Sequence, residues 1–440
     1  MKSIRHDSPP ALRRLILILA FFLFLQSNFS VWAATETVSQ YNSRTWQTDE
    51  GLPHNVVQAI TQTRDGYLWV GTREGLARFD GTHFTAFDAK NTSELKNSTI
   101  TALCADETGA LWVGSDGGGL VHLKDGVFSH YGKTNGLAGE NIRVIHESRD
   151  GSLWIGTSTG MSRFKDGKFD NYNTRYYSTR KQCLLSSIIN SIGEDTESNL
   201  WVATSGGLNR LKGDAIDAFS TTNGLPNNSL RKVCQDKEGR LWIGSNIGMT
   251  SYENGTFQTY STRNGLADNF VTSICEDREG KLWVGTYGGL SRFVGGSFES
   301  EFNSEGAPYD QVNAIFEDRE GNIWVGSKEG LIRLTPRRFF AYTKRQGLSY
   351  NNVMSVMEDR TGSLWIGTWG GGLNQLKDGK FTAYNGARGL AYSMILSTCE
   401  SRDGSLWVGE EFDGGLSRLK DGKFTHYSAK DGLIASGLKV

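Results

Sequence analysis

The chain has 440 residues, a formal net charge of -1, and much more Gly (54) and Trp (12) than Pro (6). Binding to nucleic acid is not expected, because the near-neutral sequence has no run of Lys or Arg outside its extreme N-terminus that would attract phosphates. The Gly and Trp content is typical of many short strands joined by tight turns and indicates an all-β chain.

The N-terminus has the pattern of an export signal. Arg13 and Arg14 precede an apolar run over residues 15–25, and the residues that follow suit cleavage after Ala33. The apolar run is short for a membrane span, which takes about 20 residues. Residues 1–33 are therefore expected to be a signal peptide, with an uncleaved anchor as the alternative. In both cases the rest of the chain is expected to be periplasmic or otherwise extracytoplasmic.

A repeat of about 41 residues follows the signal, and its signature is Leu-Trp-Val/Ile-Gly-Thr/Ser. Nine copies are marked by Trp69, Trp112, Trp154, Trp201, Trp242, Trp283, Trp324, Trp365 and Trp407. In one copy, the alternation of apolar and polar residues predicts strands over 271–277, 281–286, 290–294 and 297–302, separated by Gly turns. Four strands per period of this length are typical of a propeller blade. The expected fold is an all-β propeller of four-stranded antiparallel blades.

The position of the first and last strands within the repeat divides the nine copies into two groups. Residues 43–52 match a fourth strand, so a spare outer strand at the start could latch a ring onto its last blade. After Trp324 the usual turn into the fourth strand is replaced by Pro336, and proline cannot donate a ladder hydrogen bond. One spare strand, six full blades and three further strands make seven blades. A seven-bladed propeller is predicted for residues 40–335, with a single larger ring as the alternative.

Residues 336–440 are predicted to begin a second propeller. Phe339–Tyr342 would be its latching strand, and its blades would carry Trp365 and Trp407. The sequence reaches Val440 where the first strand of another unit is expected, and a partial ring exposes a sheet edge. We therefore expect this chain to be a fragment, or a truncated product, of a longer polypeptide.

Two sets of variable loops are expected on one face of the propeller, the turn after the Trp-Val-Gly-Thr strand and the loop between blades. Ligands commonly bind to such loops on a rigid scaffold. The candidate ligand-binding residues of the turn are Arg73, Asp116, Asn246, Tyr287 and Lys328. The longest loop between blades, residues 171–181, adds Tyr176, Tyr177 and Arg180, because Tyr and Arg suit hydroxyl and anion recognition. The alternatives are ordinary exposed turn residues and a silent insertion.

No catalytic residue, metal ligand or cofactor is predicted. Cys104, Cys234, Cys275 and Cys399 share one strand position and are expected to be small buried apolar residues. Carboxylate pairs such as Glu276-Asp277 recur from copy to copy, which predicts hydrogen bonds at turns and edges better than acid–base chemistry.

The copies read Val-x-x-Ile-x-Glu-Asp-x-x-Gly-x-Leu-Trp-Val-Gly-Thr-x-x-Gly-Leu-x-Arg and then Phe-x-x-Tyr-x-x-x-x-Gly-Leu. Over residues 40 to 440 they resemble the two-component regulator propeller repeat. The resemblance implies the extracytoplasmic sensor region of a bacterial membrane receptor. In that family two seven-bladed propellers are commonly followed by a β-sandwich, a transmembrane helix, and a cytoplasmic histidine kinase or diguanylate cyclase. No such transmitter is recognised within these 440 residues.

The expected function is therefore ligand sensing in the periplasm. The ligand would be a small polar molecule such as an oligosaccharide, and the signal would pass to a membrane-linked kinase or cyclase, with a homodimer left open. One alternative is a secreted propeller enzyme, a polysaccharide lyase or hydrolase that uses His54, Arg73 or tyrosines of the rim. The other is a scaffold that binds proteins.

Overall fold

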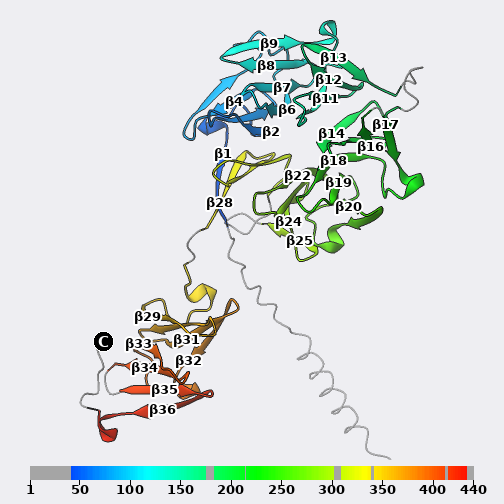
Figure 1. Cartoon of the computed structure of the whole chain (residues 1–440). Coiled ribbons are helices and arrows are strands. Elements are labelled where there is room, and N and C mark those ends of the chain that lie inside the picture. Colours follow the sequence, from blue (N-terminus) through cyan, green and yellow to red (C-terminus); the bar gives the residue numbers. More distant parts are fainter. Residues whose placement is uncertain are drawn as a thin grey trace, which may run out of the picture. The chain divides into compact units, whose positions relative to one another are not determined.

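The computed structural model describes residues 41–174, 183–213, 215–301, 309–337, 341–411 and 415–433. These residues form nine four-stranded antiparallel sheets, and none of them lies in an α-helix, which confirms the predicted all-β fold of four-stranded blades (Figure 1). The described residues divide into two compact units, the first within residues 39–338 and the second within residues 339–440. In the described part of the chain, no helix has the length and apolar character that a membrane crossing requires.

The first unit contains seven of the sheets. Its strands are β1 (Tyr41–Trp46), β2 (Val57–Gln62), β3 (Leu68–Thr72), β4 (Leu76–Phe79), β5 (Phe84–Phe87), β6 (Ile100–Ala105), β7 (Leu111–Ser115), β8 (Leu120–Lys124), β9 (Val127–Tyr131), β10 (Ile142–Glu147), β11 (Leu153–Thr157), β12 (Met161–Lys165), β13 (Lys168–Tyr172), β14 (Ile189–Glu194), β15 (Leu200–Thr204), β16 (Gly207–Lys212), β17 (Ala215–Phe219), β18 (Leu230–Gln235), β19 (Leu241–Ser245), β20 (Met249–Glu253), β21 (Thr256–Tyr260), β22 (Val271–Glu276), β23 (Leu282–Thr286), β24 (Gly289–Val294), β25 (Ser297–Glu301), β26 (Ala314–Glu317), β27 (Ile323–Gly326) and β28 (Leu331–Pro336). Short 3-10 helices lie between sheets: η1 (Thr48–Glu50), η2 (Lys133–Asn135), η3 (Thr221–Asn223) and η4 (Thr262–Asn264).

The seven sheets of the first unit surround a common axis. Six of them follow the chain, as in β2-β3-β4-β5, and the seventh has the order β1-β28-β27-β26. The first strands of the sheets are innermost, and each contacts the next in the order β2, β6, β10, β14, β18, β22, β26 and back to β2 (Figure 1). The second strand of each sheet carries the repeat tryptophan, which packs against the following sheet, as Trp242 does on Leu282 and Val284.

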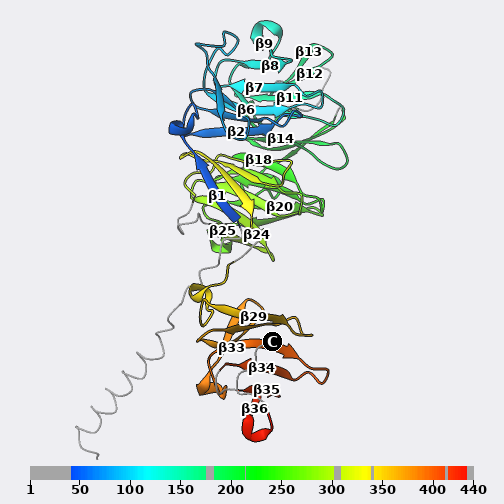
Figure 2. The same cartoon turned by 90° about the vertical axis from the view of Figure 1, so that its left-hand side faces the viewer.

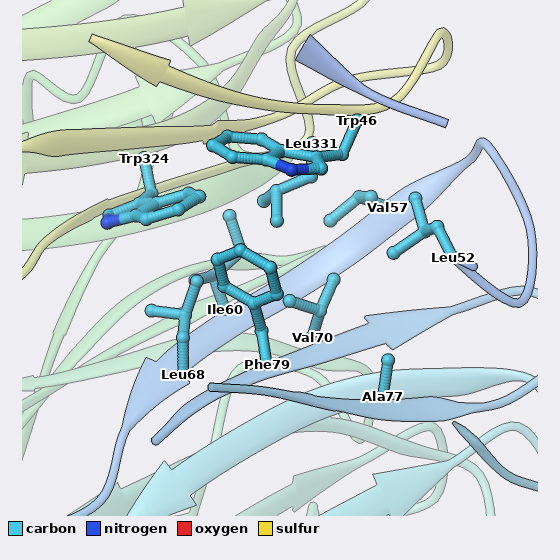
Figure 3. Packing of buried hydrophobic residues seen from close by; sticks show 10 residues of the cluster. All are labelled: Trp46, Leu52, Val57, Ile60, Leu68, Val70, Ala77, Phe79, Trp324 and Leu331. Atoms are coloured by element: carbon cyan, nitrogen blue, oxygen red, sulfur yellow. The ribbon is translucent and has the colours of Figure 1, made fainter. Parts of the chain in front are cut away.

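Strand β1 completes the seventh sheet from the other end of the unit's sequence. It pairs antiparallel with β28, with Trp46 opposite Leu331, which is the pairing that the resemblance of residues 43–52 to a fourth strand predicts (Figure 2). Trp46 is only 2% exposed, and its ring lies 5.3 Å from those of Trp324 and Phe79 (Figure 3). Because Phe79 belongs to the first sheet, this aromatic cluster packs the seventh sheet on the first.

The glycine of the Trp-Val-Gly-Thr strand lies where neighbouring sheets come closest. A Cβ atom at Gly285 would lie 2.5 Å from Val312, and one at Gly326 would lie 2.6 Å from Val57 of the first sheet. These separations are far shorter than van der Waals contact, so only a very small residue fits beside the next sheet. Ala203 is the residue at this position in β15.

The aspartate of each Glu-Asp pair fixes the turn between the first two strands. Asp277 accepts hydrogen bonds from the backbone N–H groups of Glu279 and Lys281 at 3.0 and 2.8 Å, and from the indole N–H of Trp283 at 2.9 Å. The indole–carboxylate bond recurs in other sheets at 2.7 to 2.9 Å, with the acceptors Asp106, Asp195, Asp236, Asp318 and Asp359.

The glutamate of the pair joins neighbouring sheets. Glu276 accepts a hydrogen bond at 2.9 Å from the backbone N–H of Lys237 in the preceding sheet. Gln62 is the equivalent residue at the junction of the seventh and first sheets. Its Oε1 accepts a hydrogen bond at 3.0 Å from the backbone N–H of Arg319. The prediction that these carboxylates make turn and edge hydrogen bonds is confirmed.

The second unit contains two sheets. Its strands are β29 (Val353–Glu358), β30 (Leu364–Thr368), β31 (Gly372–Lys377), β32 (Lys380–Tyr384), β33 (Ile395–Glu400), β34 (Leu406–Glu410), β35 (Leu416–Lys420) and β36 (Lys423–Tyr427), and its 3-10 helices are η5 (Lys344–Gln346), η6 (Gly386–Arg388) and η8 (Ala429–Asp431). Trp365 packs on Ile395 and Val408 of the second sheet. On β29, by contrast, Met354 and Val356 are 44% and 61% exposed.

One expected strand differs from the structure. Residues 339 and 340 lie outside the described part, and the described Ala341 and Tyr342 belong to no strand. A strand needs a neighbour for its backbone N–H and C=O groups, and no described strand pairs with these two residues.

Removing the Trp46 ring should open the junction between the seventh and first sheets. We expect Trp46→Ala to lower the free energy of unfolding of the first unit by about 3–5 kcal/mol, because large aromatic truncations in a core have this effect. Urea unfolding followed by tryptophan fluorescence measures the change. Asn42→Ala, an exposed residue of the same strand, is the control, and equal stability of the two variants would contradict the assigned latch.

The turn aspartates should make the fold sensitive to acid. Burial opposes ionisation of Asp359, but hydrogen bonds from Thr361, Trp365 and Ser363 outweigh burial and lower its pKa from 3.8 to about 2. A lowered carboxyl pKa stabilises the folded state above pH 3.8, and this stabilisation is lost as the pH falls toward 2.

We therefore expect Asp359→Asn to lower the melting temperature of the second unit at neutral pH. The melting temperature of the wild-type protein should fall between about pH 4 and pH 2, and part of this fall should be absent from the variant. Circular dichroism melts across this pH range measure both effects, with Asp378→Asn, an exposed turn residue of the same sheet, as the control. If the melting temperatures of wild type and Asp359→Asn change with pH in parallel, the Asp359 carboxylate does not stabilise the turn.

Candidate functional site: the axial cavity of the first unit

The candidate site is formed by residues at a β-bulge, which occurs in the first strand of six of the seven sheets of the first unit. In β10, for example, the register shifts between Ile142 and Val144, so Arg143 has no partner on β11. A bulge re-aims its side chain away from the ordinary alternation of the strand. The residues at the six bulges are Gln58, Thr101, Arg143, Asn190, Arg231 and Thr272, and Asn313, directly before β26, is their equivalent in the seventh sheet.

All seven of these residues line one cavity of about 380 Å³, which we call the axial cavity because the innermost strands surround it. Its other lining residues are Val56, Arg73, Asp116, Asn141, Ile142, Lys232, Tyr287 and Gln311. The volume is within the range of small-molecule sites. In the second unit, the equivalent bulge residues are Met354 and Leu396, so the bulge itself does not require a polar side chain.

Four of the bulge residues tie the wall of the axial cavity together. Each donates a hydrogen bond to a backbone carbonyl of the next sheet: Thr101 to Ile142 at 2.6 Å, Asn190 to Leu230 at 2.6 Å, Thr272 to Val312, and Asn313 to Val57 at 3.0 Å. Gln58 differs, because its buried Oε1 has no hydrogen-bond donor among the described residues. A buried polar atom of this kind is a place for a donor from water or a ligand.

Positive charge dominates the axial cavity. Arg73, Arg143, Arg231 and Lys232 line it, and Asp116 is the single carboxylate among its described lining residues. Asp116 accepts a hydrogen bond from the Asn141 side chain. Burial and the charges of Arg231 and Arg143 lower the pKa of Lys232, and burial lowers the pKa of Arg231. The field of this cavity therefore favours an anion.

An aromatic surface lies beside these charges. The Arg231 guanidinium carbon is 3.9 Å from the centroid of the Phe270 ring, and Phe270 stacks on Tyr287 at 4.0 Å. Tyr287 is 45% exposed. The stack holds Arg231 in place by a cation–π contact and presents a flat face and a hydroxyl group at the mouth of the cavity.

The structure brings together some of the residues predicted to bind ligand. Arg73, Asp116 and Tyr287 line the axial cavity, whereas Asn246 and Lys328 are exposed and do not line it. The Lys328 ammonium lies 3.7 Å from the Asp310 carboxylate. Tyr176, Tyr177 and Arg180 lie outside the described residues.

The two loop sets lie on one face, as expected. The backbone N–H of Arg73 donates to the carbonyl of Val56 at 3.3 Å, and that of Tyr287 donates to Phe270 at 3.2 Å. Both acceptors belong to the loop that leads into a first strand, so the turn and this loop are hydrogen-bonded neighbours.

Sequence reasoning missed Gln58, Arg143, Arg231 and Lys232, because they lie in strands that the repeat assigns to packing. One signal was present. Lys232 lies opposite Gly244 in the ladder, and the same position in the other six sheets is small or β-branched: Ala59, Ala102, Val144, Ser191, Ser273 and Ala314. A lysine stands out at this position, because the other six sheets place small or β-branched residues there.

His54 and the cysteines do not line the axial cavity. His54 Nδ1 accepts a hydrogen bond from the Val56 backbone N–H at 2.9 Å. Cys104, Cys234 and Cys275 were expected to be buried and are half-buried; desolvation raises the pKa of their thiols to about 12, 11 and 12. The expectation of burial is wrong for Cys399, which is exposed because no further described sheet covers β33.

Comparison with known proteins points to a family. The profile described as "Two component regulator propeller" matches residues 51–74, 94–117, 136–159, 224–246, 265–288, 306–329 and 347–370. No curated protein sequence matches the chain.

Three solved structures are similar to this chain in fold. The extracellular domain of the hybrid two component system BT3049 from B. thetaiotaomicron is 25% identical with a TM-score of 0.64, over 88% of this chain and 54% of that one. The corresponding domain of BT4673 from the same organism is 20% identical with a TM-score of 0.55, over 88% and 54%. Virginiamycin B lyase from Staphylococcus aureus shares the fold alone, at 14% identity and a TM-score of 0.52 over 67% and 98%. The chain spans about half the length of the two receptor domains.

The lysine of the axial cavity should lower the stability of the fold. We expect Lys232→Ser, which restores the small residue of other sheets, to raise the free energy of unfolding of the first unit by about 1 kcal/mol, because an uncompensated, partly buried cation is removed. Urea unfolding without ligand measures this, with Lys168→Ser on exposed β13 as the control. A less stable Lys232→Ser protein would mean that the lysine supports packing.

Proposed function

The chain belongs to the family built from two component regulator propeller repeats, and we propose that it is the extracytoplasmic ligand-sensing region of a bacterial signalling receptor. The axial cavity is its ligand site. A membrane-linked histidine kinase or diguanylate cyclase receives the signal, and export by residues 1–33 places the sensor outside the cytoplasm. The observation that carries this proposal is the convergence of polar side chains from all seven sheets of the first unit on one cavity.

The comparisons support the proposed setting. The similarity to the BT3049 extracellular domain extends over 88% of this chain, at 25% identity. That domain is the extracellular part of a hybrid two component system. The seven-sheet unit of this chain provides a rigid scaffold for a ligand.

The lining of the axial cavity suits binding of a small polar ligand such as a sugar. Asn, Gln, Thr and Arg side chains offer hydrogen-bond donors and acceptors in several directions, and the face of Tyr287 can stack on a ring. The cross-sheet hydrogen bonds of Thr101, Asn190 and Asn313 hold the wall in one geometry. Such preorganisation reduces the entropy lost on binding.

Tyr287 provides the test of this site. In a thermal-shift screen of mono- and oligosaccharides and other small metabolites, we expect at least one ligand to raise the melting temperature of the purified chain. Tyr287→Ala should weaken its binding about fivefold, since one stacked aromatic contact is worth about 1 kcal/mol. Tyr350→Ala, an equally exposed tyrosine of the second unit, is the matched control.

The signalling step is tested in the complete receptor. Ligand should change kinase or cyclase output, and Tyr287→Ala should raise the half-maximal ligand concentration by the factor found for binding. A ligand that binds the purified chain without any change in output would contradict the sensor function.

A further inference from the structure

Three basic groups of the axial cavity have no acidic partner. Arg143 on β10 and Arg231 and Lys232 on β18 form no ion pair with any described residue, although the surface of the same unit has several, such as Arg163 with Asp150 at 2.7 Å. The single hydrogen bond of the Arg143 side chain to described residues is from Nε to Asn190 at 3.0 Å. Most of the donors of the two guanidinium groups are therefore available to a ligand.

These cations repel one another where they stand. The charges of Arg231 and Arg143 contribute, after burial, to the lowered pKa of Lys232, so the three groups lie close enough to interact. Lys232 also replaces the small or β-branched uncharged residue of the other six sheets. Concentrating unpaired positive charge in this way is unfavourable for folding and becomes favourable once an anion neutralises it.

We propose that the axial cavity, the ligand site of the proposed function on which this step rests, binds a small hydroxylated organic anion. Its carboxylate or phosphate group lies between Arg143, Arg231 and Lys232. The planar guanidinium groups bind such oxyanions in a bidentate manner, and the ammonium adds a third donor.

Other residues that line the cavity contact the uncharged part of the ligand. The buried Oε1 of Gln58 lacks a donor among the described residues, and a ligand hydroxyl group would supply one. Tyr287, stacked on Phe270, offers a flat face to a ring. A cavity of about 380 Å³ holds a molecule the size of a sugar acid or sugar phosphate.

The experiment compares matched ligands that differ in charge. Isothermal titration of the purified full chain uses glucose, glucuronate, glucose 6-phosphate and inorganic phosphate as probes. We expect glucuronate or glucose 6-phosphate to bind at least about tenfold more tightly than glucose, because charge-assisted hydrogen bonds are the strongest available contacts. Added salt should weaken this binding by screening. The two acidic probes separate a carboxylate from a phosphate ester as the preferred group.

Single variants locate the anion. Arg231→Gln and Lys232→Ser should each weaken binding of the acidic probe about tenfold, with little effect on glucose. Arg263→Gln and Lys168→Ser, exposed residues of the same unit outside the cavity, are the matched controls. Unfolding curves establish that the variants are folded.

The outcomes separate this proposal from the function on which it rests. Equal binding of glucose and glucuronate, anion binding that neither cavity variant weakens, or no binding of any acidic probe at millimolar concentration overturns the anion site. Binding of neutral sugars alone overturns it while leaving ligand sensing intact. If the anion binds through Arg231 and Lys232 but the complete receptor does not respond, the anion site stands and sensing fails.

Discussion

Closure of the ring between the seventh and first sheets is the constraint on which the candidate site depends. Three kinds of contact cross this junction: the aromatic packing of Trp46, the Asn313 hydrogen bond to Val57 at 3.0 Å, and the Gln62 hydrogen bond to Arg319 at 3.0 Å. Closure brings the bulge residues of all seven sheets around one axis. The axial cavity thus exists only in the closed unit, since its opposite walls are far apart in sequence.

The residues that build the fold and those that form the site are different members of the same repeat. Aspartate, glutamate, glycine and tryptophan recur because each turn, junction and close approach needs them. The bulge residue is free to vary, since its side chain leaves the ladder. In this chain two of the bulge residues are the basic residues Arg143 and Arg231. Lys232, next to Arg231, is basic as well, although it lies at a paired position of the ladder. Folding alone disfavours these unpaired charges.

The blades were predictable because Leu-Trp-Val-Gly-Thr and the Gly turns fix strand length, strand order and the inward face of each sheet. The face that carries the variable loops was predictable as well, and Arg73, Asp116 and Tyr287 line the axial cavity. The bulges were not, because a register shift depends on pairing that no single strand specifies. Arg143 and Arg231 were therefore not among the predicted ligand-binding residues, and Asn246 and Lys328 were included although they lie outside the cavity.

A crystal structure of the chain with bound glucuronate or glucose 6-phosphate tests most directly whether the bulge residues form the ligand site. The expected result is the acidic group within hydrogen-bond distance of Arg143, Arg231 and Lys232, with the sugar ring toward Gln58 and Tyr287. An ordered ligand bound elsewhere, for example at the exposed turns of Asn246 and Lys328 while the axial cavity holds only water, would contradict it.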